Sequence, residues 1–180
     1  MPITTDNYFA FYGLPVSFGI DAAALKRAFL HKSRQHHPDF YTQADGNAQE
    51  QALAMATYNN QAYETLGNTD KRVSYVLQLK GAISPDERYD LPPAFLGQMM
   101  DINEALSEID AQQPNPQQIN SIAADLDEIA RQIEQTAQEA IVICDNDPEN
   151  TTALKKIKEF YYKKRYLLRV QKTLLTFAPH

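Results

Sequence analysis

The stretch "RQHHPDF" holds the residues best suited to chemistry, since His36 and His37 are followed directly by Pro38 and Asp39. Imidazoles and a carboxylate are groups that bind zinc or exchange protons near neutral pH. Zinc ligands must converge on one point, whereas successive residues of a helix point about 100° apart. His31 is five residues from His36 rather than three or four, and no glycine-rich loop or nucleophile is nearby. These spacings argue against a metal or acid–base site, so no catalytic residue, metal ligand or cofactor is expected.

Two other interpretations fit the same residues. A plain helix end explains them one by one, because histidines suit the negative end of a helix dipole and Pro38 disfavours helical geometry just before it. A docking signal also explains the helix before them, which Asp21 is expected to cap. At about 100° per residue, four of its basic side chains share one face: Lys26, Arg27, His31 and Arg34. Lys32, by contrast, is expected over the apolar side. An acidic partner surface is expected to meet this basic face. The stiff turn that presents His37 and Asp39 loses little entropy on binding and is expected to insert into a polar cleft of the partner.

The composition narrows the classes of protein. The chain has 180 residues, 43% of them hydrophobic, which suffices for a packed core, and a net charge of -6. That charge argues against nucleic acid or an anionic membrane as the main partner. The one cysteine, Cys144, allows no disulfide within the chain and is expected in a helix core. No apolar run approaches the ~20 residues of a membrane span, and no signal peptide is evident, so a cytoplasmic protein is expected.

Apolar residues recur at helical spacing almost throughout, which predicts an all-α fold. A short helix, an antiparallel helix pair and a fourth helix are expected within residues 1–81. Residues 82–93 contain three prolines and are interpreted as a linker. Three longer amphipathic helices with short connections then predict a three-helix bundle over residues 94–180.

Charge is divided unevenly along the chain. Residues 81–150 hold two basic and fifteen acidic side chains, whereas residues 151–180 hold eight basic and one acidic. The simplest interpretation is that the basic last helix packs beside its acidic neighbours. Nucleic-acid binding by "KKIKEFYYKKRYLLR" is an alternative, but the acidic surroundings would cancel its field.

A short helix, a basic helix, the His-Pro-Asp turn and a long helix with "NNQAYETLGN" together resemble a J domain, the module that stimulates ATP hydrolysis by DnaK-type chaperones. The longer stretch "NNQAYETLGNTDKRVSYVLQLKG" resembles the signature of HscB-type co-chaperones of iron–sulfur cluster assembly. The layout matches that family over nearly the whole chain. The resemblance implies an L-shaped protein that is not an enzyme but activates the ATPase of a DnaK/HscA-type chaperone.

The resemblance also implies which residues contact the chaperone. The His-Pro-Asp turn would trigger hydrolysis, and the basic face would steer docking. The residues expected at this contact are His37, Pro38, Asp39, Lys26, Arg27 and Arg34.

In such a protein the C-terminal bundle would bind an IscU-type scaffold protein. Leu96 and Met100 are rotated about 100–140° from Phe95 on the first bundle helix, so they are expected outside its core stripe. Packing against the linker or the J domain is the alternative for this pair, and a different client is the alternative for the bundle. The residues expected to contact the client are Leu96, Met100, Asp101, Glu104 and Glu108, with Phe160 as the aromatic contact on the last helix.

Overall fold

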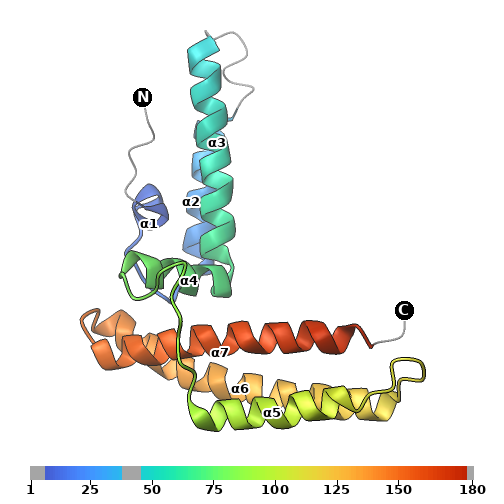
Figure 1. Cartoon of the computed structure of the whole chain (residues 1–180). Helices are drawn as coiled ribbons and strands as arrows, with labels where there is room; N and C mark the ends of the chain where they lie inside the picture. Colours follow the sequence, from blue (N-terminus) through green and yellow to red (C-terminus); the bar gives the residue numbers. More distant parts are fainter. Residues whose placement is uncertain (1–6, 38–45, 178–180) are drawn as a thin grey trace. The chain divides into compact units, whose positions relative to one another are not determined.

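The computed structural model describes residues 7–37 and 46–177 of the chain. These ranges contain seven α-helices and no strand, which confirms the predicted all-α fold (Figure 1). Contacts divide the chain into two compact units, Met1–Gly81 and Ala82–His180. No helix in the described ranges is both long and apolar enough to cross a membrane.

The first unit is built on two antiparallel helices, α2 (Ala22–Gln35) and α3 (Gly46–Gly67). The short α1 (Tyr8–Tyr12) packs against both of them, and α4 (Thr69–Leu79) packs against α3. Apolar side chains from all four helices are buried between them: Phe9, Phe11, Leu25, Leu66, Val73, Val76 and Leu77.

Side-chain caps fix where these helices begin. One Asp21 carboxylate oxygen accepts hydrogen bonds from the backbone amides of Ala23 and Ala24, at 2.8 and 3.2 Å, so the predicted cap of α2 is confirmed. Asn68 caps α4 in the same way, accepting from the amide of Lys71 at 3.0 Å. Such a cap contributes about 1 kcal/mol to helix stability.

The buried Arg72 joins α3 to α4. Its guanidinium donates to the carbonyl oxygen of Leu66 at 2.5 Å and to that of Phe18 at 2.7 Å. The last carbonyls of a helix have no partner within the helix, and a buried cation requires hydrogen bonds. Arg72 satisfies both needs with a single side chain, and so holds the end of α3 against the loop that precedes α2.

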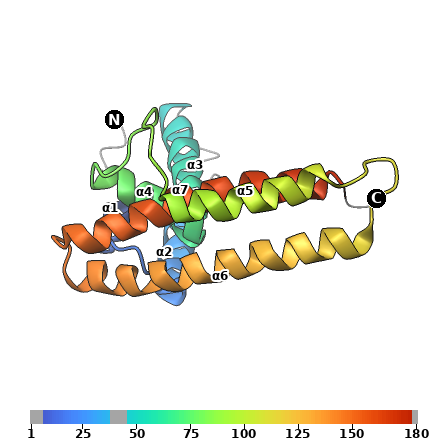
Figure 2. The same ribbon diagram turned by 60° about the horizontal axis from the view of Figure 1, so that its bottom comes forward.

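The second unit consists of a long helical hairpin and a shorter helix. The hairpin is formed by α6 (Pro116–Asn146) and α7 (Thr151–Leu175), and α5 (Pro93–Ser107) lies along it. At 1.5 Å per residue, α6 is about 46 Å long and α5 about 22 Å, so α5 cannot cover the whole hairpin. Figure 2 shows α5 along the half that is away from the α6–α7 turn.

The packing of the hairpin changes along its length. Where α5 covers it, large apolar side chains form a three-helix core: Phe95, Met99, Ile102, Leu106, Ile109, Ile122, Leu126, Leu167, Val170 and Leu174. Near the α6–α7 turn the buried residues are mostly small: Ala137, Ala140, Cys144 and Ala153. Small side chains let two helices approach closely, and Ile141 and Ile157 are the larger buried side chains at this end.

The segment predicted as a linker belongs to the second unit, where residues 82–92 form no helix. The Tyr89 ring stacks on that of Tyr162, with centroids 4.5 Å apart. Glu87 forms an ion pair with Lys158 and accepts a hydrogen bond from the Tyr162 hydroxyl at 3.2 Å. Leu91 packs against the three-helix core. These contacts hold the segment on α7 up to the first turn of α5.

Glu87 makes the stability of this attachment depend on pH. The hydrogen bond from Lys158, with those from Tyr162 and Ser84, lowers the pKa of Glu87 below its ordinary value of 4.5. Glu87→Gln is therefore expected to lower the free energy of unfolding at neutral pH. The unfolded chain binds the proton first as pH falls, so the contribution of Glu87 is full above about pH 4.5 and is lost below it. Urea denaturation of both chains from neutral to acidic pH measures this difference.

The neighbouring Asp86 is exposed, and Asp86→Asn is the matched control. A difference between Glu87→Gln and the unsubstituted chain that stayed constant into acid would contradict the role given to this carboxylate.

Candidate functional site

The basic face predicted on α2 is exposed. Lys26, Arg27, His31 and Arg34 are all exposed, and the face leads along the helix to an exposed His37. Asp21 lies 4.0 Å from the Arg27 guanidinium, and both of these side chains are well solvated. Such a pair is weak, so the face remains cationic. Pro38 and Asp39 lie outside the described residues.

Two side chains at the end of α2 turn away from this face. The Lys32 ammonium lies 5.0 Å from the centroid of the Phe11 ring, as expected for a long side chain that crosses an apolar surface. His36 is partly buried, and its burial, with the charge of Lys32, lowers its pKa. The neutral form of His36 is therefore favoured, and the two adjacent histidines occupy different environments.

A buried polar network, whose role was not predicted, fixes this end of α2. Asn59 on α3 is 1% exposed, and its amide nitrogen donates to the Ser33 hydroxyl at 2.9 Å and to the Phe29 carbonyl at 3.3 Å. Its amide oxygen accepts from the Tyr12 hydroxyl at 2.8 Å. One side chain thus joins α1, α2 and α3 about one turn before His37. The sequence signal was a single amide within the apolar stripe of α3.

Asn59→Ala is expected to lower the free energy of unfolding by about 2 kcal/mol, because it removes a buried side chain together with its hydrogen bonds to Tyr12, Phe29 and Ser33. Urea denaturation measures the change. Asn60→Ala, at the exposed neighbouring position, is expected to change it by less than about 0.5 kcal/mol. Equal effects of the two substitutions would refute the structural role of the network.

The second candidate surface lies on α5. Leu96 is 39% exposed and Met100 is 71% exposed, and the three acidic residues predicted with them are also exposed: Asp101, Glu104 and Glu108. Met99, by contrast, is fully buried in the core. An apolar pair bordered by carboxylates is typical of a surface that another protein covers. We call Leu96, Met100, Asp101, Glu104 and Glu108 the α5 surface.

Phe160 does not belong to this surface. It is 7% exposed and lies between α6 and α7. The sequence places it on the inner face of α7, with Ile157 and Leu167, and the Lys164 ammonium lies 5.5 Å from its ring centroid. The ring of Phe160 packs inward, and its role as the aromatic client contact stays a prediction.

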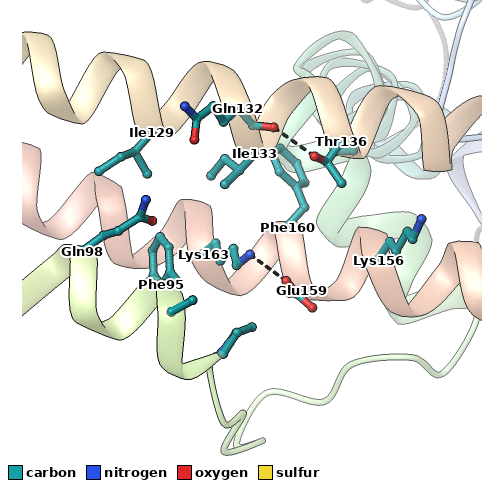
Figure 3. A pocket seen from close by; sticks show the side chains of 13 residues that line it. Phe95, Gln98, Ile129, Gln132, Ile133, Thr136, Lys156, Glu159, Phe160 and Lys163 are labelled. Atoms are coloured by element: carbon teal, nitrogen blue, oxygen red, sulfur yellow. Dashed lines mark hydrogen bonds and ion pairs between the residues drawn. The ribbon is translucent and has the colours of Figure 1, made fainter.

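Phe160 instead forms part of a pocket of about 270 Å³ at the N-terminal end of α5 (Figure 3). Phe95, Ile133 and Phe160 provide apolar surface, and Gln98, Gln132, Lys156, Glu159 and Lys163 add polar groups. The Lys163 ammonium is 2.6 Å from a Glu159 carboxylate oxygen and 5.5 Å from the Phe95 ring centroid. An apolar pocket with polar groups at its edge fits an apolar side chain of a partner protein.

The sequence analysis missed this pocket. The signal in the sequence was helix length, since α5 is about half as long as α6 and lies along only part of it (Figure 2). No group of three or more histidine, cysteine or acidic residues with metal-binding geometry occurs in the described ranges.

Comparisons with known proteins show which family has this architecture. The family model described as the HSCB C-terminal oligomerisation domain matches residues 91–175. A curated relative from Paraburkholderia phymatum, described as a co-chaperone protein HscB homolog, is 36% identical over 128 residues, which are 70% of this chain and 72% of the relative. The chain belongs to the HscB co-chaperone family. The resemblance seen in the sequence is thereby confirmed.

Three other HscB proteins are also similar to this chain in sequence or in fold. A co-chaperone protein HscB homolog from Cupriavidus taiwanensis is 38% identical over 104 residues, which span 57% of this chain and 59% of that relative. The crystal structure of human co-chaperone protein HscB has a TM-score of 0.75 and 25% identity, covering 96% of this chain and 82% of the human one. Chaperone HscB from Vibrio cholerae, at 22% identity and a TM-score of 0.55, supports the fold alone.

Proposed function

We propose that this HscB-family chain is a cytoplasmic co-chaperone that binds an IscU-type scaffold protein, delivers it to a DnaK/HscA-type chaperone and stimulates that chaperone's ATPase. Residues 1–81 act as the J domain and residues 94–180 bind the scaffold protein. The observation that carries the proposal is the cationic, exposed face of α2, which leads to an exposed His37.

The chain acts on its partner's ATPase by differential binding. A ligand shifts an equilibrium between two states only as far as it binds one of them more tightly. Lys26, Arg27 and Arg34 steer the first unit to an acidic surface of the chaperone. The turn of His37, Pro38 and Asp39 then favours the state of the chaperone that hydrolyses ATP. Hydrolysis itself takes place on the chaperone.

The scaffold protein binds the α5 surface. Leu96 and Met100 supply apolar area, and Asp101, Glu104 and Glu108 add charges that orient the partner. The pocket lined by Phe95 and Phe160 lies on the same unit and accepts one apolar side chain of the scaffold protein. Phe160 thus contributes as a wall of that pocket.

A reconstituted assay tests the proposal. The ATPase rate of a purified DnaK-type chaperone is measured with this chain, with the scaffold protein and with both, and calorimetry measures binding of the chain to the scaffold protein. We expect stimulation by the chain and direct binding of the scaffold protein. Stimulation without scaffold binding would favour a different client for the bundle. No stimulation would refute the proposal.

A further inference from the structure

A second pocket of the C-terminal unit is separate from the α5 surface. It has a volume of about 360 Å³ and lies between the 82–92 segment and α7. Its lining consists of Glu87, Tyr89, Leu91, Tyr162, Arg165, Leu168 and Arg169. The proposed function uses none of these side chains.

Two cations at this pocket have no acidic partner among the residues that the structure describes. Arg165 and Arg169 are exposed, and within the described part of the chain no carboxylate lies at ion-pair distance from either guanidinium. Their neighbours on α7 differ, because Lys158, Lys163 and Lys164 are each paired with a glutamate. The two guanidinium groups lie against rings of their own helix, 5.5 Å from the Tyr161 centroid and 5.0 Å from that of Tyr166. Stacking orients their donors while leaving them available to an anion.

The remaining walls are apolar. The stacked rings of Tyr89 and Tyr162 are nearly parallel, at 5°, and Leu168 is 50% exposed beside the two arginines. The one acid in the lining, Glu87, is already paired with Lys158 and hydrogen-bonded by the Tyr162 hydroxyl. An incoming carboxylate therefore meets two unpaired guanidinium groups and a neutralised glutamate.

We propose that this pocket binds an acidic segment of a partner protein, with an apolar side chain between two carboxylates. Residues four apart on a helix, as Arg165 and Arg169 are, have Cβ atoms about 5–6 Å apart. Carboxylates four apart on a partner helix have the same spacing and can each accept from one guanidinium. The apolar side chain between them covers Leu168 and the tyrosine pair.

Charge selects a short acidic segment over a nucleic acid. Residues 81–150 of the same unit hold fifteen acidic and two basic side chains. A long polyanion would meet these acids beyond the pocket and be repelled, whereas a short peptide meets Arg165 and Arg169 alone. The basic last helix identified in the sequence thus presents a local contact site.

The test uses the full-length chain and a fluorescein-labelled peptide of repeated Asp-Leu-Glu units, with an Asn-Leu-Gln peptide as the uncharged control. We expect the acidic peptide, but not the uncharged control, to bind at low salt. Its binding is expected to shift the backbone NMR signals of residues 87–91 and 162–169. Arg165→Gln combined with Arg169→Gln is expected to weaken binding about tenfold or more. Arg131→Gln combined with Lys155→Gln removes the same charge from exposed positions elsewhere on α6 and α7 and is expected to preserve it.

Four results would overturn the proposal. The first would be a failure of the acidic peptide to bind. The second would be an equal loss of binding in both double variants, which would reduce the effect to net charge. The third would be a shift of the same NMR signals by inorganic phosphate but not by the peptide, which would make the pocket a small-anion site. The fourth would be self-association in light scattering that the Arg165 and Arg169 double variant abolishes, which would make a second copy of the chain the occupant. The NMR arm uses the unsubstituted chain, so a variant that fails to fold does not remove the test.

Discussion

The His37→Gln chain is expected to stimulate a DnaK-type chaperone's ATPase about 30-fold less than the unsubstituted chain, since a central contact contributes about 2 kcal/mol or more. His37 is exposed where the cationic face of α2 ends, so its imidazole is accessible to a partner. Glutamine retains a polar side chain but removes the ring and its two nitrogens. Single-turnover ATP hydrolysis at several concentrations of the chain measures the loss.

Two controls separate this effect from general damage. His36→Gln makes the same substitution at the adjacent, partly buried position and is expected to keep the stimulation. Binding of the scaffold protein, which we assign to the other unit, is expected to be equal in the His37→Gln and unsubstituted chains. Full stimulation by the His37→Gln chain would show that the basic helix docks without this histidine.

Replacing both Leu96 and Met100 with serine is expected to weaken binding of the scaffold protein about 10- to 100-fold. Covering a leucine or methionine side chain contributes about 1.5–3 kcal/mol when burial is complete, and these two side chains begin 39% and 71% exposed. Neither residue is part of the buried core, so the double variant is expected to unfold at nearly the same urea concentration. Calorimetric titration of the scaffold protein into each chain provides the comparison.

The matched control is Val142→Ser with Ile143→Ser, which removes two apolar side chains of similar exposure, 51% and 46%, from α6. This pair lies near the α6–α7 turn, away from α5 (Figure 2). It is expected to leave both scaffold binding and ATPase stimulation unchanged. Unchanged binding by the Leu96 and Met100 variant would place the client elsewhere, with the pocket lined by Phe160 as the next surface to test.

Much of the helical architecture was predictable, because helical period and capping residues are local signals. The Asp21 cap, the basic face of α2 and the core stripe from Phe95 through Met99 all depend on spacing within one helix. The exposed positions of Leu96 and Met100 follow from the same periodicity. Predictions of this kind need no knowledge of the packing partner.

Features that depend on contacts between helices were not predictable in this way. Asn59 lies on an apolar stripe, and only Tyr12 and Ser33, far away in sequence, explain its amide. Proline content indicated a linker at 82–93, although Glu87 and Tyr89 gain their partners on α7 about 70 residues later. The inward packing of Phe160 was not foreseen, because a resemblance assigns a role without showing which way a ring packs.

The close approach of α6 and α7 near their turn has a consequence for experiments. Cys144, the only thiol of the chain, is 2% exposed between the two helices. A thiol-specific reagent reaches a buried sulfur only when the surrounding structure opens. The alkylation rate of the native protein therefore reports how often this end of the hairpin separates, from a natural probe that requires no engineered label.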